Sequence, residues 1–182
     1  MPSKEKLRKK YLLLRKKKYF PVEKNFFKPI VKILKSKKIK SISLYYPSNY
    51  EVDTLSLFEL LKTKKNISTY LPKLLPNGSM KFVRWSFYDP LRVNKYGFLE
   101  PVGKSKAIIP EIIVLPLLSF DKFGNRLGYG KGYYDKFLSK PSVKKNKTLT
   151  IGLAFYFQKY KKITTIKSDV KIDRILTEKG FL

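Results

Sequence analysis

Short apolar runs alternate along the chain between helical and strand-like spacing. Within 3–19, Leu7, Tyr11 and Leu14 follow an i, i+4, i+7 spacing, which predicts an amphipathic helix with Ser3 as its N-cap. Three further helices are predicted on the same grounds: 22–38, 55–61 and about 132–139. Pro29 is expected to kink the first of these three, and Asp53 or Thr54 to cap the second.

Six segments have the apolar runs and flanking turn residues of strands: 39–47, 67–72, 80–85, 112–116 within the buried run 112–120, 148–155 and 174–177. The Asn77-Gly78 pair predicts a hairpin between the second and third strands. Residues 86–110 are expected to be irregular, and 140–147 to form a lysine-rich link. The alternation of strands and helices predicts an α/β fold: a single three-layer domain over 1–182 with a largely parallel central sheet flanked by helices.

The chain has no cysteine and no histidine, which narrows its chemistry. Disulfides, thiolate zinc sites, cysteine nucleophiles and Ser-His-Asp catalysis are excluded. Lys, Arg, Asp, Glu and Tyr remain, and a metal would be Mg²⁺ on oxygen ligands. This set suits phosphate chemistry, which depends on positioning and charge stabilisation. No apolar run is long enough to cross a membrane, so a cytoplasmic protein without a membrane partner is expected.

A formal net charge of +28 raises the possibility of nucleic-acid binding. Only six of the 41 basic residues are arginine, and the lysines are scattered through almost every segment. Arginine is the usual reader of phosphates and bases, so this pattern favours a lysine-rich surface without a specific nucleic-acid partner.

Glycine and charged residues cluster in DKFGNRLGYGKGYYD, from Asp121 to Asp135. The glycines, at 124, 128, 130 and 132, surround Arg126 and Lys131, a composition that lets backbone N–H groups approach a phosphate beside two loop cations. A buried strand before the loop and a helix after it would complete a phosphate site. The spacing matches neither a P-loop nor a Rossmann fingerprint, and a flexible turn is the alternative.

Glu51 follows a predicted strand, in the kind of loop where open α/β sheets bind ligands. A solvent-exposed acidic residue is the alternative at this position.

The run FDKFGNRLGYGKGYYDKFL at 120–138 closely resembles the signature of the 5-formyltetrahydrofolate cyclo-ligase family. Weaker matches occur in the family's order at KEKLR (4–8), EVDT (51–54), YGFLEP (96–101), IGLAFYFQ (151–158) and SDVKIDRILTEKG (168–180). The resemblance covers nearly the whole chain. It implies ATP- and Mg²⁺-dependent cyclisation of 5-formyltetrahydrofolate to 5,10-methenyltetrahydrofolate, with release of ADP and phosphate. The formyl group would be phosphorylated to an imino-phosphate intermediate.

The resemblance also implies roles for individual residues. Arg126 and Lys131 would be catalytic, Asp135 and Asp169 would hold Mg²⁺, and Glu51 and Tyr134 would contact the substrate. The ATP-binding residues would be Lys4, Glu5, Lys6, Leu7, Arg8, Arg126, Leu127, Gly128, Tyr129, Gly130, Lys131, Gly132, Tyr133 and Tyr134. Structural alternatives remain open at this point: solvated helix charges for Lys4 and Arg8, helix-end or turn capping for the aspartates, and core packing for the tyrosines.

The expected partner is a small molecule, 5-formyltetrahydrofolate or its polyglutamylated form, and the chain is expected to be monomeric. Two other function classes stay open: a basic nucleic-acid-binding protein, and a sugar-phosphate- or coenzyme-A-handling α/β enzyme. The cyclo-ligase hypothesis requires Glu51 and Asp135 to lie at one cleft.

Overall fold

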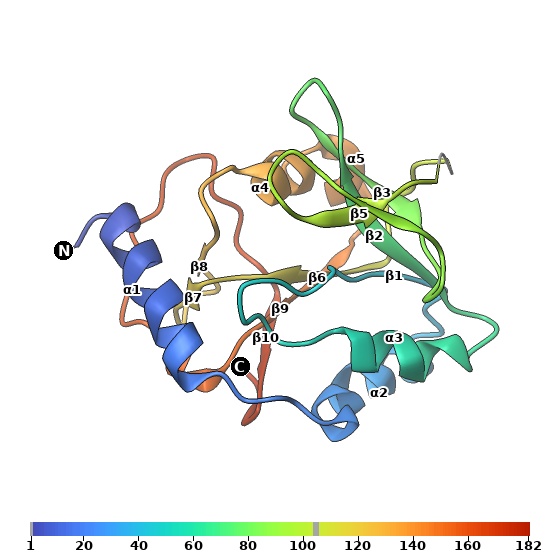
Figure 1. The fold of residues 1–182 in the computed structure, drawn as a ribbon, viewed down its shortest axis with the longest axis horizontal. Coiled ribbons are helices and arrows are strands. Elements are labelled where there is room, and N and C mark those ends of the chain that lie inside the picture. Colours follow the sequence, from blue (N-terminus) through green and yellow to red (C-terminus); the bar gives the residue numbers. More distant parts are fainter. Residues whose placement is uncertain (1, 104–105) are drawn as a thin grey trace.

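The computed structural model describes residues 2–103 and 106–182, and its centre is a seven-stranded sheet (Figure 1). The strand order is β11-β10-β9-β6-β1-β2-β3. Five neighbouring strands, β10 to β2 in this order, run parallel, while β3 and β11 are antiparallel strands at the two edges. In sequence order the strands are β1 (Ser41–Ser43), β2 (Ser68–Leu74), β3 (Met80–Arg84), β6 (Ile112–Pro116), β9 (Leu149–Leu153), β10 (Arg174–Thr177) and β11 (Gly180–Phe181).

Helices cover both faces of this sheet (Figure 1). The helical elements are α1 (Lys4–Lys18), α2 (Lys28–Ser36), α3 (Leu55–Lys62), α4 (Tyr133–Leu138) and α5 (Pro141–Lys145), with short 3₁₀ turns at Lys24–Phe27 and Tyr156–Gln158. Alternation along β6 assigns the faces, because Ile112 and Val114 join the core beneath α2 and α3, whereas Ile113 and Leu115 join the core beneath α4 and α5. The three-layer α/β architecture with a largely parallel sheet is confirmed.

Helix α1 stands at one end of the sheet, beside a small hairpin formed by β7 (Ser119–Phe120) and β8 (Arg126–Leu127) (Figure 1). Its Leu7 and Tyr11 pack with Leu127 in a separate apolar cluster. Ser3 caps the helix as predicted, since its Oγ accepts a hydrogen bond from Lys6 N at 3.3 Å. The first helix is therefore fixed against the chain segment that carries the glycine cluster.

Two N-terminal predictions need correction. The helix expected over 22–38 is a 3₁₀ turn followed by α2, and Pro29 lies in the first turn of α2, where its missing N–H costs nothing, so it does not kink the helix. The strand expected over 39–47 is shorter: β1 covers Ser41–Ser43, and Leu44 N still donates to Tyr70 O of β2 at 2.9 Å. Asp53, rather than the Thr54 side chain, caps α3 through a 2.8 Å bond from Leu55 N.

The middle of the chain is more ordered than its composition predicts. The described part of 86–110 contains a hairpin of β4 (Leu91–Val93) and β5 (Leu99–Pro101); positions 104–105 lie outside the described residues. The Asn94 side chain organises its turn by accepting from the N–H groups of Tyr96 and Phe98. The lysine-rich segment 140–147 contains α5, started by Pro141. The hairpin predicted at Asn77-Gly78 is confirmed.

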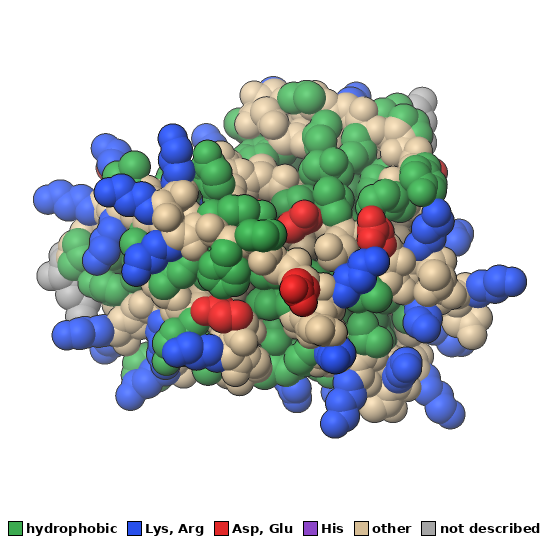
Figure 2. Space-filling view, turned by 60° about the horizontal axis from the view of Figure 1, so that its bottom comes forward, with side chains coloured by type: hydrophobic (Ala, Val, Ile, Leu, Met, Phe, Trp, Pro, Cys, Tyr) green, Lys and Arg blue, Asp and Glu red, His purple; other side chains and the backbone are tan. Residues whose placement is uncertain are grey.

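Charge is dispersed on the surface seen in Figure 2. Lys and Arg side chains spread around the periphery of that face, while hydrophobic side chains and a few acidic ones occupy its centre. This view agrees with a lysine-rich surface rather than one compact basic patch. Among the described residues, no helix is both long enough and apolar enough to cross a membrane.

Candidate active site

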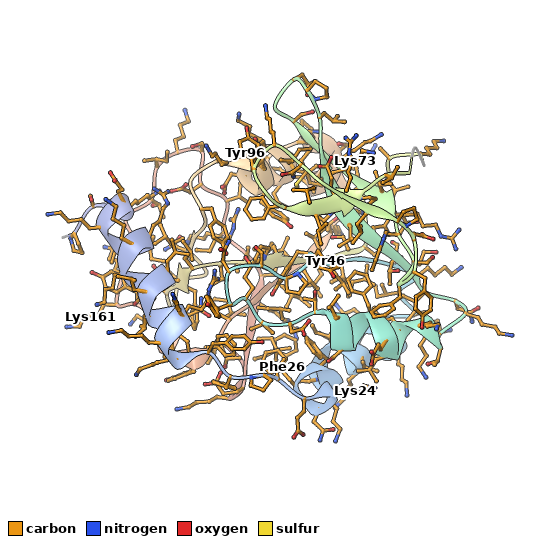
Figure 3. The ribbon with its side chains drawn as sticks, in the orientation of Figure 1. Lys24, Phe26, Tyr46, Lys73, Tyr96 and Lys161 are labelled. Carbon is orange, nitrogen blue, oxygen red and sulfur yellow. The ribbon has the colours of Figure 1, made fainter. Side chains whose placement is uncertain are left out.

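A cavity of about 380 Å³ lies where the chain leaves the carboxyl ends of β1 and β6. These two strands are neighbours at the centre of the parallel set, and the chain continues from them to opposite sides of the sheet, the usual ligand position in doubly wound folds. Its walls come from the loop after β1, the β2–β3 and β4–β5 hairpins, and the segment from β8 into α4. Figure 3 labels two lining residues, Tyr46 after β1 and Tyr96 in the β4–β5 hairpin. The volume falls in the range of small-molecule sites.

The glycine loop connects β8 to α4 along one wall of this cavity. Gly132 has φ +68° and is the N-cap of α4. Gly130 has φ +95°, and a Cβ there would come within 3.0 Å of Arg8 Cζ, so only glycine fits without displacing that guanidinium. Arg8 Nε also donates to Gly128 O at 3.0 Å. Helix α1 therefore supports the loop from behind.

Arg126 is an ordered, mostly buried cation rather than an exposed loop cation. It lies on β8, and its side chain is 6% exposed. Its Nη2 donates to Asp135 Oδ1 at 2.9 Å, and its Nη1 donates to Val170 O. Arg126 and Asp135 both line the cavity, so the structure joins the predicted catalytic arginine to the predicted metal ligand.

Lys131 is exposed at the cavity wall, with its Nζ 5.2 Å from the centroid of the Tyr96 ring. Next to it, Tyr133 Oη donates to Tyr96 Oη at 2.9 Å. The β4–β5 hairpin therefore touches the glycine loop across the cavity, a contact between segments that the sequence pattern did not connect.

Glu51, in the loop after β1, also lines the cavity and is buried. Tyr129, in the glycine loop, donates its hydroxyl proton to Glu51 Oε1, and Ser48 N donates to Oε2 at 2.9 Å. Burial raises the pKa of the Glu51 carboxyl above its ordinary value; the Arg15 charge and the Tyr129 hydrogen bond oppose that rise. Glu51 and Asp135 thus lie at one cavity, as the cyclo-ligase hypothesis requires.

Tyr134 also lines the cavity. The buried Oη has no hydrogen-bond partner in the part of the chain that the structure describes. Burial raises the pKa of this phenol, so it stays a neutral donor. An unpaired buried hydroxyl is costly, and a polar group of a ligand would satisfy it.

The residues predicted to bind ATP from the first helix differ in their surroundings. Lys4 Nζ pairs with Asp169 Oδ2, Glu5 pairs with Lys9 on the surface, and Leu7 is buried in the apolar cluster. Lys6 is exposed, and Leu127 is buried with Leu7. None of these residues lines the cavity; Arg8 comes nearest through its contacts with the glycine loop.

The two predicted metal ligands are connected through Val170. Val170 N donates to Asp135 Oδ1 at 3.0 Å, and Asp169 precedes Val170 in the chain. No group of three or more acidic side chains able to hold a metal occurs within 2–103 and 106–182. Each aspartate uses one oxygen in its reported bonds, so these donors suit Mg²⁺, which keeps several waters and takes ligands from substrate phosphates.

Sequence reasoning missed Arg15, which is 1% exposed and donates from Nη2 to Tyr129 Oη at 2.6 Å. A signal was present, because Arg15 continues the stripe of Leu7 and Tyr11 at the next i+4 position. It also missed the cavity residues of the β4–β5 hairpin, namely Asn94, Tyr96, Phe98, Leu99 and Glu100. The resemblance had marked that stretch but assigned none of its residues to the site.

Fold and cavity together define a doubly wound α/β protein with a small-molecule site at its topological switch point. The site is lined by carboxylates and by cationic side chains of the kind that bind phosphate. The model of the family described as "5-formyltetrahydrofolate cyclo-ligase family" matches residues 1–178. The chain belongs to this family and is a ligase.

Individual relatives agree. The chain is 32% identical over 150 residues to 5-formyltetrahydrofolate cyclo-ligase of Haemophilus influenzae, covering 79% of each chain. It is 33% identical over 139 residues to the Mycoplasma genitalium protein of that name, covering 76% of this chain and 72% of that one. The solved 5,10-methenyltetrahydrofolate synthetase of Mycoplasma pneumoniae superposes with a TM-score of 0.73 at 28% identity, covering 96% and 98% of the two chains. The Aquifex aeolicus synthetase gives 0.73 at 32% identity, covering 98% and 91%.

Proposed function

We propose that the chain cyclises 5-formyltetrahydrofolate to 5,10-methenyltetrahydrofolate, using ATP and Mg²⁺ and releasing ADP and phosphate. The cyclo-ligase activity follows from membership of the family. The observation that carries the proposal for this site is that Glu51 and the cationic glycine loop face one cavity. A generic nucleic-acid binder needs no such largely apolar cavity.

The reaction activates the formyl group by phosphorylation. The formyl oxygen attacks the γ-phosphorus of ATP, and ADP leaves as the O–P bond forms. N10 then attacks the formyl carbon of the imino-phosphate, the C–O bond breaks, phosphate leaves with the bonding electrons, and N10 gives up its proton. The two steps need charge stabilisation and positioning, which Lys, Arg and Tyr supply without histidine or cysteine.

Lys131 and Arg126 are assigned to the transferring phosphoryl group. Lys131 is exposed at the cavity wall, and Arg126 has five N–H donors, more than its bonds to Asp135 and Val170 occupy. Positive charge held at that place stabilises the phosphoryl oxygens in the transition state. The backbone N–H groups from Arg126 to Tyr134 are assigned to the triphosphate. Arg8 supports this segment through its bond to Gly128 O, and Lys4 is held near the site by its ion pair with Asp169.

Glu51 and Tyr134 are assigned to the folate substrate. The Glu51 carboxylate accepts N–H donors of the pterin ring, and the buried Tyr134 hydroxyl pairs with a polar group of the ligand. Asp135 and Asp169 would hold Mg²⁺ together with phosphate oxygens and water, and the metal would neutralise phosphate charge.

The remaining expectations belong to this proposal as well. They are one domain over 1–182, a monomer, a cytoplasmic location and acceptance of polyglutamylated substrate. Sedimentation, cell fractionation and kinetics with substrates of different tail length would test them.

The decisive experiment is a spectrophotometric assay. Purified protein is mixed with 5-formyltetrahydrofolate, Mg²⁺ and ATP, and formation of the methenyl chromophore is followed with and without ATP. We expect product only when ATP is present, with ADP released in equal amount. Absence of product in the complete mixture, from protein that is folded by circular dichroism, would overturn the proposal.

A further inference from the structure

Helix α1 buries an arginine beneath the active-site cavity. Arg15 is 1% exposed, and its burial is costly because a desolvated charge requires compensation. Its Nη1 lies 3.4 Å from Leu117 O, its Nη2 donates to Tyr129 Oη at 2.6 Å, and its Nε has no partner among the described residues. Arg15 does not line the cavity. A buried cation with these few partners contributes little net stability to the fold, because its desolvation is costly. Its partners therefore indicate its role.

Those partners form a continuous chain of hydrogen bonds into the cavity. Arg15 donates to the Tyr129 oxygen, Tyr129 donates its proton to Glu51 Oε1, and Ser48 N donates to Glu51 Oε2. Arg15 Cζ also lies 5.7 Å from the centroid of the Tyr129 ring. Tyr129 and Glu51 line the cavity from two different segments, so these hydrogen bonds link the glycine loop to the residue assigned to the substrate.

The positive charge of Arg15 opposes the rise in the Glu51 pKa that burial causes. The titratable groups that face this carboxylate are Arg15 from α1, Tyr129 from the glycine loop, Tyr45 from the segment after β1 and Tyr134 from α4. Burial raises the pKa of all three tyrosines, which therefore stay neutral. Of this set, only the guanidinium supplies positive charge.

We propose that Arg15 is a positioning residue that, through Tyr129, keeps Glu51 charged and oriented as the hydrogen-bond acceptor for the substrate. This inference rests on the proposed function of the cavity. Because Arg8 on the same helix contacts Gly128 and Gly130, α1 holds the glycine loop at consecutive positions and sets both the phosphate-binding backbone and the substrate acceptor.

Four variants test this role. Arg15→Met removes the charge but keeps an unbranched, though shorter, side chain, and Arg15→Lys keeps the charge. Tyr129→Phe removes the linking hydroxyl, and with it the acceptor of Arg15 Nη2, but keeps the buried positive charge. Lys16→Met removes an exposed positive charge at the adjacent helix position and is the matched control.

The first readout is the pH dependence of kcat/KM for the folate substrate. Loss of an adjacent cation raises a carboxyl pKa by about 1 unit or more, so Arg15→Met should move the acidic limb upward by about that much. The variant would then be about tenfold slower below the limb and close to wild type well above it. Arg15→Lys and Lys16→Met should keep the wild-type limb, and Tyr129→Phe should shift it in the direction of Arg15→Met. An equal loss at every pH in Arg15→Met, or an unshifted limb in both Arg15→Met and Tyr129→Phe, overturns the proposal.

The second readout is independent of catalysis. Side-chain ¹³C-labelled glutamate allows the Glu51 carboxyl to be titrated by NMR, with Glu51→Gln identifying its signal. We expect a higher apparent pKa in Arg15→Met than in wild type, and a wild-type value in Lys16→Met. An unchanged Glu51 titration in folded Arg15→Met, or in folded Tyr129→Phe if the former does not fold, contradicts the proposal. Absence of cyclo-ligase activity in the wild type would overturn the proposed function alone, because this titration still decides the role of Arg15.

Discussion

Arg126 Nη2 donates to Asp135 Oδ1 at 2.9 Å, so the cation that begins the glycine loop and the carboxylate that follows it form one ion pair. Both residues line the cavity, and Arg126 also donates to Val170 O. The loop is therefore closed at its base by side chains from its two ends. This arrangement gives Arg126 a structural role in addition to its proposed catalytic one.

Arg126→Ala should reduce both stability and turnover. It removes charge-assisted hydrogen bonds from a side chain that is 6% exposed and leaves Asp135 without its cation, so we expect a loss of about 1–3 kcal/mol in the free energy of unfolding. Urea unfolding measures it. Arg174→Ala, at an exposed arginine outside the cavity, is the control and should change stability by less than about 1 kcal/mol, because it loses only an exposed cation–π contact with Phe181. Equal stability of Arg126→Ala and wild type would show that the pair contributes nothing to the fold.

Lys131→Ala should behave differently, because Lys131 is exposed and its reported contact is with the exposed Tyr96 ring. Removing one group that stabilises transition-state charge typically costs about 10²–10³ in turnover. We expect a loss of that size with an unchanged melting temperature. Lys136→Ala, an exposed lysine on α4 outside the cavity, should keep wild-type kcat. Normal turnover in Lys131→Ala would remove this lysine from the phosphoryl site.

The sequence was most informative where function concentrates residues at close spacing. The run from Asp121 to Asp135 identified the glycine loop, and a continuous apolar run identified the core strand β6. The hairpin β7–β8, whose second strand lies inside that run, was missed, because two-residue strands have no periodicity to detect.

Other site features depend on tertiary contacts. The β4–β5 hairpin reaches the glycine loop through Tyr96 and Tyr133, which lie 37 positions apart in sequence, and no local pattern predicts that pairing. Arg15 was not singled out, because arginine is rarely buried. Glu51 was placed correctly after a strand, but its burial requires Tyr129 and the cavity walls, which the sequence does not show.

Asp135→Asn should weaken Mg²⁺ dependence while preserving shape. The amide keeps an oxygen for the Arg126 and Val170 bonds but loses the negative charge that attracts the ion. We expect the Mg²⁺ concentration for half-maximal rate to rise by about tenfold. Asp89→Asn is the control, since Asp89 is an exposed acid that bonds to Ser86 N away from the cavity. Superimposable Mg²⁺ titrations of Asp135→Asn and wild type would exclude Asp135 as a ligand.

Asp121→Asn should destabilise the protein in a pH-dependent way. Asp121 is 1% exposed, and its Oδ2 accepts from Ile163 N and from Asn125 Nδ2, both at 2.9 Å. An amide NH₂ at that place cannot accept, so the buried Ile163 N–H loses its partner, at a cost of about 2 kcal/mol.

The sign of the pH dependence follows from the pKa of Asp121. Burial alone would raise this pKa, but the hydrogen bonds from Ile163, Asn125 and Phe123 outweigh it and hold the pKa below its ordinary value. The carboxylate therefore stabilises the fold fully above its unfolded pKa of about 3.9, and that stabilisation is lost as the pH falls through the lower folded value. The difference in unfolding free energy between wild type and Asp121→Asn should be largest near pH 7 and shrink below about pH 4. Urea unfolding at pH 7 and at pH 3 measures it, and a difference that stays constant between the two would show that the Asp121 charge does not stabilise the turn before the glycine loop.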